Sequence, residues 1–225
     1  MKILLTMMIM AVLLVSMAAC GDSDDPSGPV AGNDHEFYPM AVGNVWQYDR
    51  SGTISMGGSQ IGSLSGEATI EISGTETHSG GFQVFVQDVH VTDTTTTMGQ
   101  TFYVDSSFTE YLRLTDGGLF GYRHLTDTDS SFTVPFPIQL GATWTFQEEP
   151  PTTGEILSLS ASVTVPAGSF SDCMEMQLTW IDSGMTVMNT ADFARNVGEV
   201  RNVFHNTFGT YETIITNSLE SYNLY

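Results

Sequence analysis

One sequence pattern occurs twice in the chain, and this repetition constrains the fold more than any other feature. The segment Tyr38-Pro-Met-Ala-Val-Gly-Asn-Val-Trp-Gln-Tyr48 returns as Phe136-Pro-Ile-Gln-Leu-Gly-Ala-Thr-Trp-Thr-Phe146, with Pro, Gly and Trp each displaced by 98 positions. Pro fixes an extended backbone, Gly permits a turn that other residues resist, and Trp-x-aromatic places two rings on one face of a strand. Each copy therefore predicts the opening of one half of a β-rich domain, an internal repeat with halves of approximately 37–134 and 135–225.

The remainder of the folded part also has the periodicity of strands. Beyond Phe37 no stretch keeps a helical period, whereas apolar and polar residues alternate between turns rich in Gly, Pro and Asp. This spacing predicts an all-β fold of meandering antiparallel strands, either a curved sheet or a partly open barrel. Strands are predicted at residues 45–51, 67–73, 83–91, 101–104, 110–114, 119–125, 143–147, 156–165, 174–181, 186–193, 199–204 and 211–219.

Two segments between these strands are poor in core-forming residues. Residues 52–66 are rich in Gly and Ser, and we expect a weak hairpin or a mobile loop there. Residues 93–97 read Asp-Thr-Thr-Thr-Thr, which predicts an exposed turn or an edge.

The N-terminus has the form of a secretory leader. Lys2 precedes an apolar run, and small residues then lead to Cys20 and a polar, acidic stretch. This arrangement resembles the lipobox of bacterial lipoproteins, in which the Cys is lipidated and becomes the mature N-terminus; the alternative is an ordinary secretory signal with an incidental Cys. We therefore predict a signal peptide over 1–19, lipidation at Cys20, a flexible acidic tether over 20–36 and a β-rich domain over 37–225.

The predicted mature chain is strongly acidic. Lys2 is the only lysine, so removal of the leader leaves five arginines against all 26 acidic residues, a formal balance of −21. Such a surface repels phosphate backbones and anionic headgroups, so we expect no nucleic acid partner and no docking through a basic patch. The expected anchor is the lipid alone, which would hold the protein in the bacterial cell envelope, at the periplasmic or the surface face of the outer membrane.

The sequence offers few candidates for catalysis. Zinc-helix, P-loop, serine-hydrolase and dinucleotide motifs are absent. Cys173 has no cysteine partner once Cys20 is lipidated, and we interpret it as a small buried hydrophobe because no activating base lies nearby in the sequence. We therefore predict no catalytic residue, no cofactor and no enzymatic activity.

Candidate metal ligands are equally sparse. His90 shares a strand face with Asp88, and the pair would form a metal site only if His124 or His205 lay on a neighbouring strand. The segment 127–130 presents closely spaced oxygens of the kind that calcium takes, but it lacks the Gly and distal Glu of an EF-hand loop. An exposed polar face and an acidic turn explain these residues better, so we predict no metal site.

Four kinds of short segment occur together in this chain: the two Pro-x-x-x-Gly-x-x-Trp segments, Val165-Pro-Ala-Gly-Ser-Phe-Ser-Asp-Cys173, Ala194-Arg-Asn-Val-Gly-Glu-Val200 and Leu219-Glu-Ser-Tyr222. Together they resemble a group of bacterial lipoproteins of unknown function that have a lipoprotein-carrier-like β fold. Members more usually carry Pro-Gly where this chain has Arg195 and Asn196. The resemblance implies fold and location, and it implies no catalytic residue.

These features favour a non-enzymatic envelope protein that binds or scaffolds, with an apolar molecule held in the curve of the sheet. The expected partners are the membrane, through the lipid, and an apolar small molecule or a protein. The acidic run Asp22-Ser-Asp-Asp25 resembles surface-export tags of some lipoproteins. It motivates the alternative of a cell-surface adhesion or partner-binding module.

Overall fold

A computed structural model describes residues 34–148 and 150–225. The predicted signal peptide, Cys20 and the tether up to residue 33 lie outside the described residues. Asp34–Phe37 forms a 3-10 helix, η1, so regular structure begins three residues before the predicted domain boundary at Phe37.

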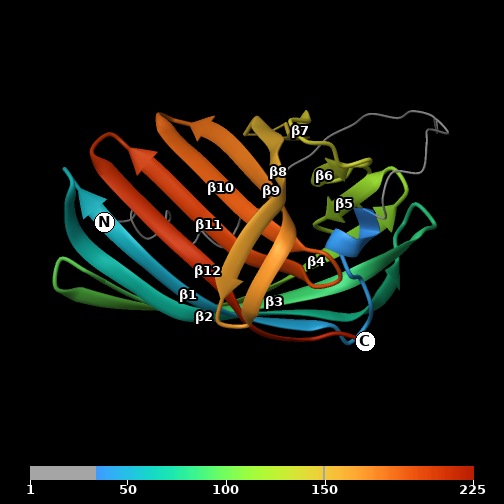
Figure 1. The fold of residues 1–225 in the computed structure, drawn as a ribbon, viewed down its shortest axis with the longest axis horizontal. Coiled ribbons are helices and arrows are strands. Elements are labelled where there is room, and N and C mark those ends of the chain that lie inside the picture. The colour runs from blue at the N-terminus through green and yellow to red at the C-terminus, as the bar shows by residue number, and fades with distance from the viewer. Residues whose placement is uncertain (1–33, 149) are drawn as a thin grey trace.

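Twelve antiparallel strands form one meandering sheet (Figure 1). Consecutive strands pair throughout the series β1 to β6 and throughout the series β7 to β12, and β1 pairs with β12 to join the two series. The strands are β1 Val45–Met56, β2 Ser59–Thr77, β3 Gln83–Thr97, β4 Gln100–Thr115, β5 Gly118–Tyr122, β6 Phe132–Pro135, β7 Thr143–Gln147, β8 Thr152–Val165, β9 Gly168–Asp182, β10 Met185–Ala194, β11 Gly198–Phe208 and β12 Tyr211–Asn223.

The sheet curls into a nearly closed barrel with one unsealed seam. Strands β6 and β7 are the two ends of the hydrogen-bonded order, yet they lie next to each other. Side chains connect them: the Trp144 indole N–H donates to the Thr133 carbonyl at 2.7 Å, and the Phe132 and Phe146 rings stack with centroids 5.1 Å apart. The prediction of an all-β meander is thus confirmed, and the barrel form with an open seam is the one adopted.

The two copies of the repeated pattern make matching hydrogen bonds. Gly43 and Gly141 have φ values of 95° and 75°, a region that favours Gly. The Gly43 N–H donates to the Ile72 carbonyl at 2.8 Å, and the Gly141 N–H donates to the Ile156 carbonyl at 2.9 Å. Each copy precedes the first strand of one series, so the copies sit at the β12–β1 junction and at the seam.

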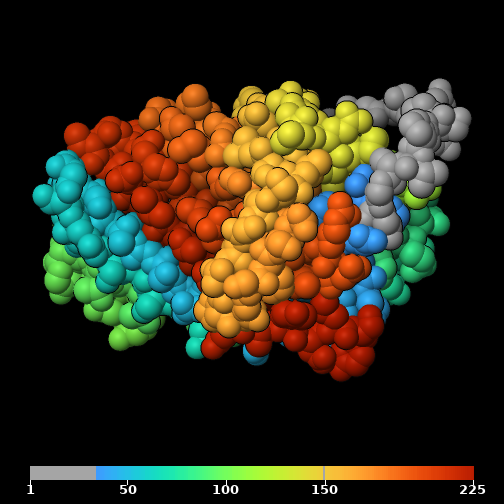
Figure 2. Space-filling view, viewed as in Figure 1, coloured from blue at the N-terminus to red at the C-terminus, as the bar shows by residue number. Residues whose placement is uncertain are grey.

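The hairpin of β8 and β9 adds a second layer outside the barrel wall. Figure 1 shows this hairpin crossing in front of β10, β11 and β12, and Figure 2 shows its yellow and orange atoms lying across the red strands. The Ala167 N–H at its turn donates to the Leu219 carbonyl at 2.9 Å. Cys173 is fully buried in the apolar cluster that this contact encloses, in agreement with its interpretation as a buried hydrophobe.

Several strand boundaries differ from the prediction. Residues 52–66 belong to the long β1–β2 hairpin, so the expectation of a hairpin there is confirmed and that of a loop is wrong. Residues 101–104 and 110–114 are parts of one strand, β4, and the short strand β6 was not predicted.

The segment 93–97 is the clearest correction, since it is part of a paired strand and not a turn or an edge, and three of its five side chains are buried. It completes β3, and Asp93, Thr95 and Thr97 are buried on the face that Val89 and Val91 begin. Polar composition suggested exposure, but strand alternation continues through the segment and carries every second side chain inward.

No helix among residues 34–148 and 150–225 is long and apolar enough to cross a membrane.

Candidate functional site: a cavity inside the barrel

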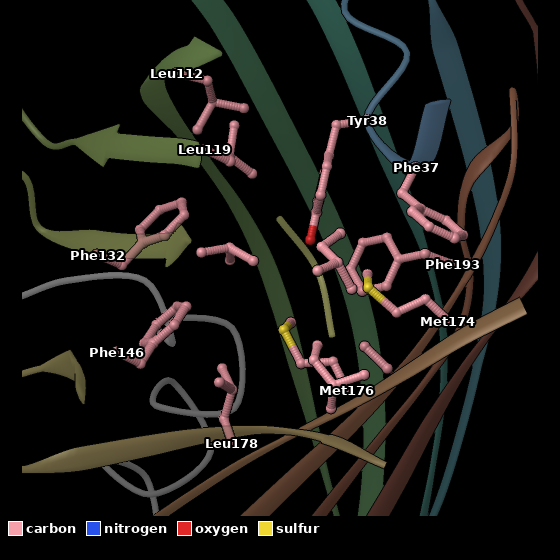
Figure 3. Close-up of a cluster of buried hydrophobic side chains, with 14 residues drawn as sticks. Phe37, Tyr38, Leu112, Leu119, Phe132, Phe146, Met174, Met176, Leu178 and Phe193 are labelled. Carbon is pink, nitrogen blue, oxygen red and sulfur yellow. The ribbon is translucent and has the colours of Figure 1, made fainter. Parts of the chain in front are cut away.

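The interior of the barrel contains a partly open cavity of about 280 Å³ whose wall is largely apolar and aromatic. Figure 3 shows part of this wall, with Phe132 and Phe146 facing Tyr38 and Phe193 across the interior. Every strand except β8 contributes residues to the lining, because successive side chains of a strand point to opposite faces and one set points inward. The apolar lining includes Trp46, Tyr48, Val89, Val91, Leu112, Phe132, Phe146, Leu178 and Phe193.

The cavity exists because small residues occupy several inward positions. Ala68, Ala191 and Gly198 line it beside much larger neighbours. Gly198 has a φ of 96°, and a Cβ placed on it would lie 3.3 Å from the Trp46 indole nitrogen. Ala68 and Ala191 are smaller than the Leu or Phe that these positions of the wall could carry, whereas Gly198 lets its strand approach the Trp46 ring closely.

The N-terminal segment closes one end of the barrel. The Ile138 N–H donates to the Asp34 carboxylate at 2.9 Å, and the Asn196 N–H donates to the Glu36 carbonyl at 2.6 Å. Arg195 pairs with Glu36 at 3.2 Å. These contacts hold Phe37 and Tyr38 over the cavity, where both are buried. Asn196 adopts a φ of 59°, a left-handed conformation that Asn visits more readily than most other residues.

A buried ion pair forms one polar part of the wall. The Arg50 guanidinium donates two hydrogen bonds to the Asp93 carboxylate, at 2.9 and 3.0 Å, and a third to the Asn217 side-chain oxygen at 2.7 Å. The Arg50 and Asp93 side chains are 3% and 4% exposed. Gly66 makes room for the pair, because a Cβ there would overlap the Asp93 carboxylate. The charge of Arg50 is therefore compensated within the protein.

Glu110 is a second polar feature, and it has no such cation beside it in the cavity. Its side chain is buried, and its one hydrogen bond comes from the Gln87 amide at 3.2 Å. Burial raises the pKa of Glu110 to about 8, although the Gln87 hydrogen bond and the more distant charge of Arg123 oppose the shift. Burial therefore favours the protonated form of this carboxyl group near neutral pH.

Glu199 carries the third polar group, next to the closing segment. Burial raises the pKa of Glu199 to about 7, against a weak hydrogen bond of 3.5 Å from the Asn202 amide. Tyr38 lies close to it: burial, reinforced by the charge of Glu199, raises the pKa of the Tyr38 phenol well above its ordinary value. The Tyr38 hydroxyl is buried and makes no hydrogen bond with any described residue, and Figure 3 shows it pointing into the interior.

The residues considered from the sequence lie elsewhere. His90 and Asp88 sit on the outer side of β3, where His90 Nε2 is 2.9 Å from Asp105 and the Thr109 hydroxyl donates to Asp88. His205 is paired with Glu212 instead, at 2.8 Å. Within the described ranges no three His, Cys, Asp or Glu side chains come together as a metal site would require.

The other two candidates also have structural partners. Asp127 accepts hydrogen bonds from the Arg123 and His124 backbone N–H groups, in the turn between β5 and β6. Burial raises the pKa of the Cys173 thiol, and the nearby carboxylates of Asp192 and Asp172 raise it further, which disfavours the thiolate that a nucleophile needs.

Sequence reasoning missed the acidic groups that line the cavity. A signal was present in the alternating run Phe108-x-Glu110-x-Leu112, which places a carboxylate on the apolar face of one strand. Glu199 gave no comparable signal, because a bulge opposite Phe193 displaces the alternation of β11.

Comparisons with known proteins give fold likenesses only. No protein-family model and no curated protein matches the chain. Three solved structures are similar: a predicted exported protein with a YmcC-like fold from Bacteroides fragilis (15% identity, TM-score 0.45), a predicted lipoprotein from Parabacteroides distasonis (17%, 0.40) and a β-barrel-like protein of a domain of unknown function from Brucella abortus (12%, 0.46). The matches cover 82–83% of this chain and 98% of each of the others. Likeness at this level carries no argument about function.

Proposed function

We propose that this protein is a lipid-anchored bacterial envelope lipoprotein that holds an apolar small molecule inside its barrel, without catalysing a reaction. The cavity carries this proposal. Its volume of about 280 Å³ lies near the lower end of small-molecule pockets, which span about 300–1,000 Å³, and its wall has their usual composition of apolar and aromatic side chains with a few polar groups.

Two features support a binding role over a purely structural one. The interior is lined by large aromatic side chains, yet the inward positions Ala68 and Ala191 carry small residues and a cavity remains. The wall also includes the Tyr38 hydroxyl and the Asn189 side-chain oxygen, which are buried without partners among the described residues and cost stability unless a ligand engages them.

The location and the origin of the fold belong to the same proposal. The lipobox-like segment ending at Cys20 supports an anchor in the outer membrane, and residues 20–33 would separate the barrel from the bilayer. The matched hydrogen bonds of Gly43 and Gly141 support the interpretation of 37–134 and 135–225 as halves of an internal repeat that build one core.

Native mass spectrometry of residues 34–225, which contain every described element, tests the binding role. The protein should be purified from a bacterial envelope fraction without detergent exchange. We expect an additional mass, lost on collisional activation, from a co-purified lipid or other apolar molecule. A variant with Ala191→Phe, which fills the cavity, should lose that mass while keeping the far-ultraviolet circular dichroism of a β protein. A clean apo mass, together with failure to take up added alkyl ligands, would contradict the proposal.

A second candidate is the partner-binding module, and one observation favours it. Four hairpin turns at the same end of the barrel expose large apolar side chains: Met56, Met98, Ile181 and Phe208, between 46% and 66% exposed. Protease shaving of intact cells tests this role, because a surface adhesin should be cleaved whereas a periplasmic carrier should be protected.

A further inference from the structure

The polar groups of the cavity restrict the kind of molecule that fits it. Arg50, Glu110 and Glu199 are the ionisable acids and bases among the described residues that line the wall, apart from the tyrosines. Asp93 already engages Arg50 through two hydrogen bonds. The charges left for a ligand are therefore acidic.

Hydrogen-bonding capacity points the same way. One carboxylate oxygen of Glu110 accepts no hydrogen bond from the described residues, and Glu199 receives only the long contact from Asn202. The Tyr38 hydroxyl, in a side chain that is 6% exposed, is also without a partner and points into the interior. Each carboxyl group can only accept once it is ionised, and a hydroxyl can accept as well as donate, so the vacant capacity beside an ionised Glu110 or Glu199 is mostly for accepting.

From this arrangement we infer that the cavity takes a cationic amphiphile, an alkyl chain that ends in a protonated amine, with the ammonium group held by Glu110 or Glu199 and the chain against the aromatic wall. An ammonium group brings three donors and no acceptor, which complements these side chains. A fatty acid would instead place its carboxylate beside two acidic residues. The inference rests on the proposed function, because it names the class of ligand for the same cavity.

Binding of such a ligand should release protons. In the empty cavity Glu110 and Glu199 hold protons near neutral pH because burial disfavours their charged forms. Glu110 interacts with the Gln87 amide and the charge of Arg123. Glu199 interacts with the Asn202 amide, the charge of Asp192 and the phenols of Tyr38 and Tyr48. An ammonium ion would favour the ionised carboxylate, so affinity for an amine should increase from about pH 6 to about pH 9 and fall once the amine itself loses its proton, near pH 10.

Three ligands with the same ten-carbon alkyl chain, decylamine, decanol and decanoate, distinguish the contribution of the head group to binding from that of the alkyl chain. Isothermal titration of residues 34–225 should give decylamine at least a tenfold lower Kd than decanol at about pH 8, and decanoate the highest Kd. Glu110→Gln keeps the shape of the side chain and should remove most of the amine preference without changing decanol binding. Glu67→Gln, on the exposed side of β2, is the matched control and should change neither.

The outcomes distinguish a failure of this inference from a failure of the proposed function. Equal Kd values for decylamine and decanol, or tighter binding of decanoate, would overturn the cationic head group and leave the apolar cavity intact. Failure of all three to bind would instead contradict the proposed function. Should Glu110→Gln not fold, titration of the unmodified protein in buffers of different ionisation enthalpy decides the matter, since decylamine must release protons on binding and decanol must not.

Discussion

Replacing Arg50 by Met should destabilise the barrel severely, because it leaves the Asp93 carboxylate buried without its cation. Both side chains are at most 4% exposed, and three hydrogen bonds from the guanidinium are lost together. Breaking a buried ion pair by removing one partner costs about 3–5 kcal/mol. For a domain of this size, in which 1 kcal/mol shifts the Tm by about 2–4 °C, the Tm of Arg50→Met should fall by about 6–20 °C.

Urea unfolding of residues 34–225, followed by the fluorescence of Trp46, Trp144 and Trp180, measures this loss. Adding Asp93→Asn to Arg50→Met removes the stranded charge and should recover part of the stability, so that the double variant loses at least about 1.5 kcal/mol less than the sum of the single losses. The exposed pair of His90 and Asp105 supplies the control, since Asp105→Asn should cost about 1 kcal/mol or less. A similarly small loss for Arg50→Met, or full additivity in the double variant, would refute the reasoning.

Three other predictions follow from features of the same fold. Because burial raises the pKa of Glu110 from 4.5 to about 8, the folded state keeps a proton that the unfolded chain loses, so the free energy of unfolding should decrease as pH rises from 4.5 to about 8, and Glu110→Gln but not Glu67→Gln should flatten this dependence in urea titrations. A Cβ at Gly121 would overlap the Phe132 ring, so Gly121→Ala should cost about 1–3 kcal/mol in urea unfolding, whereas Gly74→Ala, which has open space around it, should cost less. Cys20→Ser should release the protein from membranes in cell fractionation, and continued attachment would reveal an anchor other than the predicted lipid.

Alternation and turn chemistry were sufficient to predict the class of fold. The paired rings of Trp46 and Tyr48 face inward as expected, and Gly43 adopts the predicted positive φ. The segment 93–97 was misassigned because its polar composition was given more weight than the alternation of the strand that precedes it. Asp93, Thr95 and Thr97 are polar, but they continue the buried face of β3. The strand at 132–135 was missed because it is short and ends at a Pro.

The candidate site was less accessible to sequence reasoning. The cavity depends on which inward residues are small, and that depends on how twelve strands face one another across the interior, a long-range property. Glu110 could have been found from its place on the apolar face of β4. Arg50 and Asp93 are 43 positions apart and lie on strands that are not adjacent in the sheet. Their ion pair therefore could not be predicted from a local sequence pattern.

The unsealed seam gives this barrel a circumference that can change. Widening the barrel at the β1–β12 junction would break a ladder of twelve residue pairs. Separating β6 from β7 would break no strand pairing, and it would remove the Trp144–Thr133 hydrogen bond and the stacking of Phe132 on Phe146. Phe132 and Phe146 also line the cavity, so the same displacement opens the interior to the side. If the barrel binds a molecule longer than the cavity, as the proposed function allows, the seam would be its lateral route inward, and the hydrogen-bonded ladders would stay intact.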